Sequence, residues 1–333
     1  MNYKKINRRK FLDYAKLSFV FFVSSCQSLP KKISIGLHKK FLPNSLIDSL
    51  PKKWTIKNIN FVNKKLNKTI RNQNLILVND GWLNNIKIQD YNDINSYLLK
   101  NLDERSKNYL SQWDMNDRKK LYPIGVTPYA LVIKNNNNYK ISNKDSWDLL
   151  LSKEFSGKII LPNSARIIIS LANRISRENP IKALISQDNI YDDKYAIDLL
   201  VNTDALLALM PLTNCNRYLK FDARLSLVFP NQGVPLIWNF FLLKKNLNQK
   251  EILNWSNKLV DKKISNKLVE EGWYLPFNNP SIQDQYLLKG ENNNKIIYDK
   301  PSEECWKNSW SFASLKNYEK KKLEDFWKKS LTP

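Results

Sequence analysis

The segment FPNQGVPLIWNFFLLKK, residues 229–245, is an apolar run that follows a glycine turn and contains one neutral amide, Asn239, beside Trp238. A run of this kind predicts a buried strand. A buried amide needs partners for its donor and acceptor groups, so it either ties down neighbouring backbone or faces a cavity. The second alternative makes Asn239 a candidate ligand contact, and Trp238 is either a second contact or part of the core.

The beginning of the chain has the pattern of an export signal. Basic residues between positions 4 and 10 precede Leu17–Val23, an apolar stretch that is much too short to span a bilayer. The sequence RRKFL, residues 8–12, resembles the twin-arginine signal. Asp13 is unusual at this point of such a signal, so the general export pathway stays open.

A lipid-attachment motif follows. Val23-Ser24-Ser25-Cys26 resembles a bacterial lipobox, in which the cysteine is lipidated and becomes the mature N-terminus. We therefore expect a signal peptide over residues 1–25, a linker over 26–32, and lipidation of Cys26. The protein would lie in the periplasm or on the outer face of the cytoplasmic membrane, held there by its lipid anchor.

The net charge of +23 is the feature that first suggests nucleic acid. It falls to about +18 when the signal peptide, with six positive charges and one negative, is removed, and Lys predominates over Arg. No zinc-finger, aromatic RNP or Arg-rich signature accompanies the charge. We therefore expect a solvated lysine-rich surface and no nucleic-acid partner.

The composition argues against an enzyme. The chain has one His and seven Gly, and it contains no P-loop, G-x-S-x-G elbow or HExxH motif. No pair of carboxylates stands out either. We expect no catalysis, no cofactor and no metal. Cys215 and Cys305 either form a disulfide, which an oxidising compartment would permit, or are two buried free thiols.

Strand-like and helix-like segments alternate along the chain, which predicts a sheet with helices on its faces. The expected strands are Ile33–Ile35, Asn74–Val78, Tyr129–Ile133 and Lys158–Leu161. Helices are expected after Pro43, over Trp147–Leu151, from Ser164, over Asn248–Leu268 with Gly272 as its stop, and over Tyr318–Leu331, where Leu323, Phe326 and Trp327 would pack on one side.

Candidate site residues follow two of the expected strands. Ligands of α/β sheets lie beyond the carboxyl ends of the strands. His38 follows the first strand, and Asn79-Asp80-Gly81-Trp82 follows the second, so we expect His38, Asn79, Asp80 and Trp82 on one rim. Each has a structural alternative: a lone structural histidine, a turn residue before Gly81, or a core tryptophan.

The helix that begins at Pro162-Asn163-Ser164 contributes a second group. Its apolar residues at 167, 168, 171, 172 and 175 follow the helical period, and Ser164 is a fitting N-cap. A helix N-terminus favours an anion or a carbonyl. Asn163, Ser164 and the nearby Arg166 are therefore candidate ligand contacts, although Arg166 alternatively forms a salt bridge within its own half of the molecule.

Five segments, in order, carry a resemblance to a known family: YPIGVTPYALVIKN, SWDLLLSKEFSGKIILPNSARIII, FPNQGVPLIWNFFLL, EEGWYLPFN and EDFWKKS. Together they resemble the extracellular solute-binding proteins of ABC transporters, nearest the spermidine/putrescine-binding group. The likeness runs from about residue 33 to the end and is thin over Lys52–Asn72.

The resemblance implies an α/β, two-lobed periplasmic-binding-protein-like fold of type II, with two inter-lobe crossings. Lobe one would comprise residues 33–125 and 238–299, and lobe two 126–237 and 300–333. Proline and glycine at Pro123–Pro128 and Gly233–Pro235 agree with two crossings there. The lobes would close around a small solute by a hinge motion and deliver it to an ABC transporter permease.

The resemblance also places residues in the cleft. Polyamine binders of this group hold amines with aromatic side chains and carboxylates. His38 and Phe41 match an aromatic pair of the group, whereas Ser164, Ile167 and Asn239 stand where it has acids. Removing a buried charged partner costs about 2–5 kcal/mol. We therefore expect altered specificity and weak polyamine binding.

The sequence thus predicts a monomeric extracytoplasmic solute-binding lipoprotein, polyamine-binder-like but with changed specificity. The alternative is a non-transporting surface lipoprotein, a scaffold that kept the fold. Asn214, in the loop PLTNCN, completes the set of candidates. The predicted ligand contacts are His38, Phe41, Asn79, Asp80, Trp82, Asn163, Ser164, Arg166, Asn214, Trp238 and Asn239.

Overall fold

The computed structural model describes residues 33–39, 42–61, 70, 72–134, 146–187, 189–192, 194–244, 247–278, 301–312, 315 and 317–331. The predicted signal peptide, the linker with Cys26, and Phe41 lie outside these residues. Within them, helices cover a mixed sheet, so the predicted α/β fold class is confirmed. No helix in this described part combines the length and the apolar character needed to cross a membrane.

The described strands form a single sheet in the order β2-β1-β3-β9-β4-β7-β5-β6, and β8 pairs with β4 beside this path. Strands β1 and β3 are parallel neighbours, as are β5 and β7, whereas β9 and β4 run antiparallel to their neighbours on the path. The strands are β1 (Ile33–Leu37), β2 (Trp54–Asn58), β3 (Leu75–Asn79), β4 (Tyr122–Lys134), β5 (Ile159–Leu161), β6 (Ile190–Tyr191), β7 (Leu207–Pro211), β8 (Leu225–Val228) and β9 (Leu236–Leu243).

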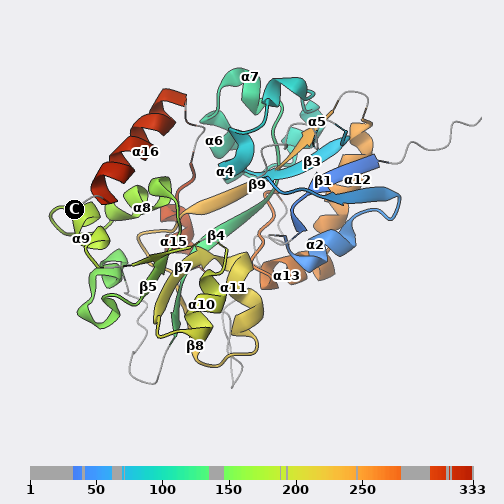
Figure 1. The fold of residues 1–333 in the computed structure, drawn as a ribbon. Helices are drawn as coiled ribbons and strands as arrows, with labels where there is room; N and C mark the ends of the chain where they lie inside the picture. Colours follow the sequence, from blue (N-terminus) through green and yellow to red (C-terminus); the bar gives the residue numbers. More distant parts are fainter. Residues whose placement is uncertain are drawn as a thin grey trace, which may run out of the picture.

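The helices lie on both faces of this sheet (Figure 1). The α-helices are α2 (Asn44–Ser49), α4 (Asp80–Leu83), α5 (Ser96–Lys100), α6 (Glu104–Ser111), α7 (Met115–Arg118), α8 (Ala165–Ala172), α9 (Pro180–Ile185), α10 (Ala196–Asn202), α11 (Leu212–Leu219), α12 (Gln249–Leu259), α13 (Lys262–Glu270), α15 (Glu303–Asn308) and α16 (Asn317–Leu331). Three short 3-10 helices complete the described elements: η2 (Ile88–Asp90), η3 (Trp147–Leu151) and η4 (Lys153–Phe155).

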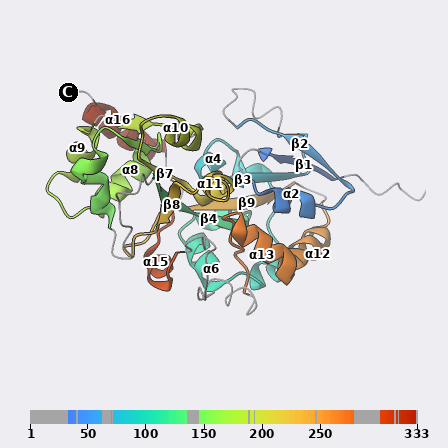
Figure 2. The same cartoon turned by 90° about the horizontal axis from the view of Figure 1, so that it is seen from below.

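Strands β4 and β9 run through the middle of the molecule (Figure 1). On one side lie β1 and β3 with α2, α12 and α13, and on the other lie β5, β7 and β8 with α8 to α11. Figure 2 gives the same division from below, with α16 next to α8 and α9 at one end. The lobe boundaries expected at residues 125/126 and 237/238 fall within β4 and β9, and they stay a prediction.

Strand β4 includes the segment Pro123–Pro128, which was expected to precede the strand as a crossing between lobes. Pro lacks the N–H that a strand uses in its ladder, so it lies at bulges or edges. Pro123 lies at a shift in the register with β9. Pro128 is the last residue paired with β9, and pairing with β7 begins at Tyr129. The expected start of the strand at Tyr129 was therefore wrong, because both prolines occupy positions that a strand tolerates.

The segment before α16 returns to the centre of the molecule. Trp310 pairs with Pro235, with its N–H bonded to the carbonyl of Val234 and its carbonyl accepting from Leu236. Gly233, at φ +87°, precedes this contact, and a Cβ atom there would lie 2.2 Å from the carbonyl carbon of Asn308. Only glycine permits both the left-handed backbone and the close approach.

The helix expected over Trp147–Leu151 is present as a 3-10 helix. Two other helix predictions need correction. The helix expected over Asn248–Leu268 is two helices, α12 and α13, because the Asp261 carboxylate accepts from the Lys263 N–H and so caps a new helix. On α16, Phe326 is 46% exposed while Trp327 is buried, so the three residues do not all pack on one side.

Helix α8 agrees with the prediction from the sequence. Its predicted apolar face, Ile167, Ile168, Leu171 and Ala172, is buried, and Ser164 is the N-cap residue. The Ser164 side chain forms no capping hydrogen bond, however. Cys215 and Cys305 are buried free thiols, so of the two alternatives for these cysteines the structure has the unpaired one.

Candidate functional site

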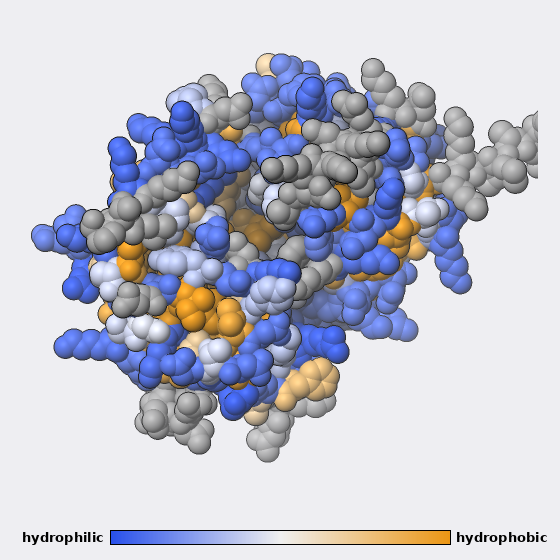
Figure 3. All heavy atoms as spheres, viewed as in Figure 1, coloured by the Kyte–Doolittle hydropathy of each residue, from blue (hydrophilic) through white to orange (hydrophobic). Residues whose placement is uncertain are grey.

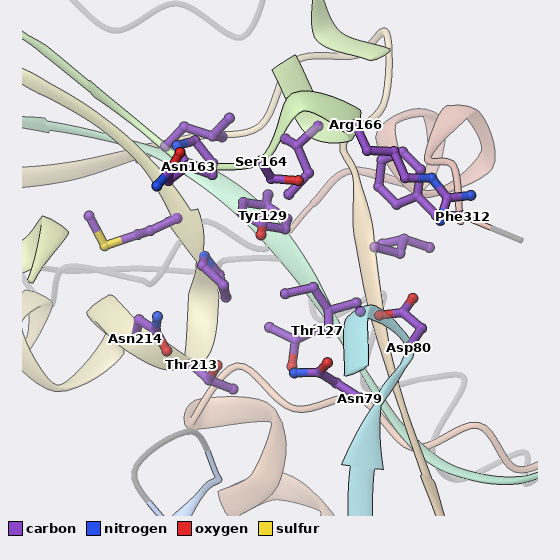
Figure 4. Close-up of a pocket in the computed structure, with 18 of the residues that line it drawn as sticks. Asn79, Asp80, Thr127, Tyr129, Asn163, Ser164, Arg166, Thr213, Asn214 and Phe312 are labelled. Atoms are coloured by element: carbon purple, nitrogen blue, oxygen red, sulfur yellow. The ribbon is translucent and has the colours of Figure 1, made fainter. Parts of the chain in front are cut away.

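A cavity of about 420 Å³ lies where the two sides of the molecule meet. Figure 3 shows a hollow near the centre of one face, with apolar residues at its bottom and hydrophilic residues around it. Two walls face each other across the cavity. We call residues 79–82 with Leu236, Ile237 and Asn239 the strand wall, and residues 162–167 the helix wall (Figure 4).

The cavity brings together most of the residues predicted from the sequence. They come from the end of β3 and the start of α4, from the start of α8, from α11 and from β9, which are far apart in the chain. The predicted residues that line it are Asn79, Asp80, Trp82, Asn163, Ser164, Arg166, Asn214 and Asn239. Their contact with a solute stays a prediction, since no solute is part of the structure.

Trp238 does not line the cavity. It is fully buried, its ring stacks on Tyr109 with centroids 4.7 Å apart, and its indole N–H donates to Ser311 Oγ at 2.7 Å. Successive side chains of a strand point to opposite faces. Since Asn239 faces the cavity, its neighbour Trp238 faces the core, and only one of the two can form the wall.

His38 also lies outside the lining. It follows β1, on the same rim as Asn79, and it is partly buried. Strand β3 lies between β1 and β9, so the strand order separates His38, after β1, from Asn239 on β9. Phe41, its predicted aromatic partner, belongs to the part of the chain that the structure does not describe.

Several residues that line the cavity were not predicted from the sequence. Thr127 and Tyr129 project from β4, Thr213 comes from the start of α11, and Asp192 follows β6. The alternation of β4 gives a signal for Thr127, because Gly125, which pairs with Asn239, and Thr127 lie on one face of the strand. Phe312 had no such signal, since the turn that brings it to the cavity follows α15.

Asp80 is the acid of the strand wall. Its carboxylate Oδ2 accepts from the Trp238 backbone N–H at 3.3 Å and lies 3.2 Å from the Tyr109 hydroxyl. Burial raises the pKa of Asp80 from 3.8 to about 7, although these two hydrogen bonds and the charge of Arg166 act in the opposite direction. A large share of the molecules therefore carries a neutral Asp80 at neutral pH.

The Tyr109 hydroxyl has two acceptors within reach. The phenol oxygen lies 3.2 Å from Asp80 Oδ2 and 2.8 Å from the carbonyl oxygen of Phe312. A phenol has one hydrogen and can donate to only one of these acceptors at a time. The Phe312 carbonyl therefore competes with Asp80 for the hydrogen bond that lowers the pKa of Asp80.

Arg166 is the positively charged residue of the helix wall. Its guanidinium lies over the Phe312 ring, 4.8 Å from the centroid, and the side chain is partly buried (Figure 4). Burial lowers the pKa of Arg166, while the negative charge of Asp80 opposes this shift. Arg remains protonated at physiological pH, and it is the one cationic side chain among the described residues that line the cavity.

Two buried polar side chains face the cavity without a protein partner. Thr127 is 2% exposed and its Oγ1 has no hydrogen bond. Asn239 is 7% exposed, and no side-chain hydrogen bond joins it to another described residue. A buried polar group that lacks a partner costs about 1–3 kcal/mol. The amide in the apolar run of β9 therefore faces a cavity and does not tie down backbone.

Comparison with known proteins identifies the fold. No protein-family model and no curated protein matches the sequence. Solved structures do match, and the fold is that of the two-lobed periplasmic binding proteins, as predicted. One similar structure is the spermidine/putrescine ABC transporter substrate-binding protein PotD from Streptococcus pneumoniae, with 14% identity and a TM-score of 0.67, covering 91% of this chain and 100% of that chain.

A second similar structure is the Tp0655 (TpPotD) lipoprotein of Treponema pallidum, with 10% identity, a TM-score of 0.62, and 90% and 98% of the two chains covered. A third is a eukaryotic thiaminase-I, with 13% identity, a TM-score of 0.57, and 91% and 100% covered. At these identities the similarity shows the fold. It confirms the predicted resemblance at that level, and it shows that an enzyme shares the fold with the binding proteins.

The structure offers no metal site among the residues that it describes, because no three His, Cys, Asp or Glu side chains gather in them. The described lining of the cavity contains neither His nor Cys. Its polar groups are amides, hydroxyls, Arg166, and the acids Asp80 and Asp192. Such a set binds and orients a polar molecule by hydrogen bonds.

Proposed function

We propose that this protein is an extracytoplasmic solute-binding lipoprotein, which captures a small solute in the cavity between its two walls and delivers it to an ABC permease. The observation that carries the proposal is the open cavity of about 420 Å³, lined by polar groups from distant segments and containing the buried Thr127 and Asn239. The fold of binding proteins such as PotD supports the same role.

The lobe boundaries, the lipid anchor and the monomeric state in this proposal are taken from the predictions made from the sequence. Lobe one comprises residues 33–125 and 238–299, lobe two comprises 126–237 and 300–333, and the lobes close on the solute by a hinge within β4 and β9. Cys26 carries the lipid anchor, and the protein is a monomer. Its place outside the cytoplasm rests on the RRKFL and lipobox motifs.

Two alternatives have less support. A scaffold that kept the fold but lost its ligand would be expected to fill the cavity with side chains, yet Thr127 and Asn239 face open space. An enzyme would use a nucleophile or a base in the lining, but Asp80 and Asp192 both accept hydrogen bonds from the protein itself. Binding of a solute, in contrast to catalysis, requires only hydrogen-bonding groups such as those that line the cavity.

Thermal unfolding in the presence of a metabolite library tests the proposal. A solute at 100 times its dissociation constant adds about 2.7 kcal/mol to the free energy of unfolding, a readily measured shift of the midpoint. We expect at least one library member to produce such a shift. Absence of any stabilising compound would contradict the solute-binding role and favour the scaffold.

The altered specificity has its own test. Asn239→Asp restores an acid at the position that the resemblance assigns to an ammonium contact, and we expect it to raise the affinity for putrescine by about 30-fold or more. Asn173→Asp adds the same charge at the C-cap of α8, outside the cavity, and serves as the control. If calorimetry detects no gain with Asn239→Asp, the alignment of the cleft with polyamine binders is wrong.

A further inference from the structure

Both acids that line the cavity accept hydrogen bonds from other groups of the protein. Asp80 accepts from Trp238 and contacts Tyr109, and Asp192 Oδ1 accepts from the backbone N–H groups of Lys194, at 2.8 Å, and Tyr195. A cationic solute would have to compete with these donors. Arg166 lies over the Phe312 ring, interacts electrostatically with Asp80, and contributes a permanent positive charge to the lining of the same cavity.

The helix wall adds further donors. Pro162, Asn163, Ser164, Arg166 and Ile167 all line the cavity, so the first turn of α8 faces it. The Ser164 side chain does not cap this turn. The first N–H groups of a helix have no partner within the helix, and together with the helix dipole they favour an anion. The Arg166 charge and the helix N-terminus therefore both favour an anion at this wall.

The opposite side offers a different chemistry. Thr127 and Asn239 are more than nine-tenths buried, have no side-chain hydrogen bond to another described residue, and lie on neighbouring strands, where Thr127 pairs with Ile237 and Asn239 with Gly125. A hydroxyl and an amide both donate and accept. They suit an uncharged polar group at the far end of the solute from the anion.

A second cavity, of about 570 Å³, adjoins the first and shares Ala196, Met210, Thr213 and Asn214 with it. Four cations line it, Lys39, Lys194, Arg217 and Lys220, against three acids. Two of these acids accept hydrogen bonds from protein groups, Asp198 from Tyr218 and Glu271 from Ser45. With a net charge of about +18 once the predicted signal peptide is removed, this approach attracts anions.

We infer that the solute is a small organic carboxylate, whose anionic group docks between Arg166 and the first turn of α8 and whose uncharged polar end bonds Thr127 and Asn239. The inference rests on the proposed function and specifies its substrate class. A planar guanidinium accepts a carboxylate with two parallel hydrogen bonds, and the Phe312 ring beneath it fixes the plane.

Calorimetry with defined probes tests the inference. The carboxylates are L-glutamate, L-glutamine, succinate and lactate, and the comparison compounds are putrescine, spermidine, glycerol and inorganic phosphate. We expect at least one carboxylate to bind the full-length protein, and Arg166→Met to weaken it by about 30-fold or more. Arg174→Met is the matched control, because Arg174 also lies over an aromatic ring, Trp310, but outside the cavity.

A second variant and a pH series test the inference even if the Arg166→Met variant does not fold. Arg166→Lys keeps the charge without the planar fork, and we expect a loss of about 10-fold. Carboxylate affinity should fall between pH 6 and 8 as Asp80 ionises beside Tyr109 of α6, Arg166 of α8 and the Trp238 N–H of β9. The affinity of a cation would rise over the same range.

The outcomes separate the inference from the proposed function. Binding of a polyamine, glycerol or phosphate with no binding of any carboxylate overturns the carboxylate assignment and leaves the solute-binding role standing. Silence of all eight probes counts against the carboxylate assignment, whereas the metabolite library decides the solute-binding role. Equal binding by wild type and Arg166→Met overturns the role of Arg166.

Discussion

The two walls of the cavity treat their charged groups differently. On the strand wall, Asp80 accepts from the Trp238 N–H and contacts the Tyr109 hydroxyl, which in turn reaches the Phe312 carbonyl. On the helix wall, Arg166 rests on the Phe312 ring and the first turn of α8 has no side-chain cap. The acid of the strand wall is engaged in hydrogen bonds within the protein, whereas the helix wall places a positive side chain at the cavity.

This contrast bears on the predicted change of specificity. Ser164, Ile167 and Asn239 are uncharged, and the remaining acid of the strand wall is bonded within the protein and has its pKa raised to about 7. Under the proposed alignment with polyamine binders, few substitutions would change the charge of the cleft while the strands that carry it stay in place. Three measurements can break or sharpen the contrast, beginning with the largest expected effect.

The first compares Trp82 of the strand wall with Trp238, which lies in the core behind it. Trp238 is fully buried against Tyr109, whereas Trp82 is partly exposed and stacks on Phe61 at 6.3 Å. We expect Trp238→Ala to lower the free energy of unfolding by about 3–5 kcal/mol, and Trp82→Ala by less than half as much. Urea unfolding measures both. Similar losses would mean that Trp238 is not the core anchor of this wall.

The second concerns the charge of Asp80. Its folded-state pKa is raised from 3.8 to about 7, so the folded protein binds the proton more tightly than the unfolded chain does. The stabilisation is complete below about pH 4 and is lost as the pH rises to about 7. The expected loss is about 3–4 kcal/mol.

Asp80→Asn mimics the neutral acid, so its stability should lack this component of the pH dependence. The difference between the wild-type and variant urea midpoints, measured from pH 4 to pH 8, isolates the contribution of Asp80. The same substitution at the exposed Asp90 is the control. A constant difference across this range would contradict the raised pKa and with it the neutral strand wall.

The third prediction, with the smallest effect, concerns the unpartnered hydroxyl. Thr127→Val keeps the shape of the side chain and removes a buried polar group that has no protein partner, so we expect the solute-free protein to gain about 1 kcal/mol. Thr203→Val is the opposite control, because Thr203 Oγ1 donates to the Leu199 carbonyl at 2.7 Å. A loss of stability in Thr127→Val would show that its hydroxyl serves the fold.

Much of the fold could be predicted from local patterns. The apolar spacing of α8 fixed its buried face, and the runs before His38 and Asn79 gave β1 and β3. These succeed because their periods reflect burial directly. The split between α12 and α13 was missed, because the capping carboxylate of Asp261 interrupts a stripe of apolar residues that continues across it.

The cavity was predictable where strand ends or helix starts supply its residues. Asn239 was found because a single amide in an apolar run requires a partner or a cavity. Trp238 was misplaced, because the sequence does not say which of two successive side chains faces the cavity until the register with β3 and β4 is known. Phe312 was missed, because its position depends on pairing of Trp310 with Pro235, a contact between distant segments.

The position of Phe312 after the last described strand, β9, has a consequence for biosynthesis. Residues 309–312 bridge Val234, Trp238 and Tyr109, all of which the ribosome has made much earlier. A nascent chain that has not yet reached residue 309 holds every described strand of the sheet but lacks the aromatic support of Arg166. The cavity is therefore completed only after every described strand of the sheet has been synthesised.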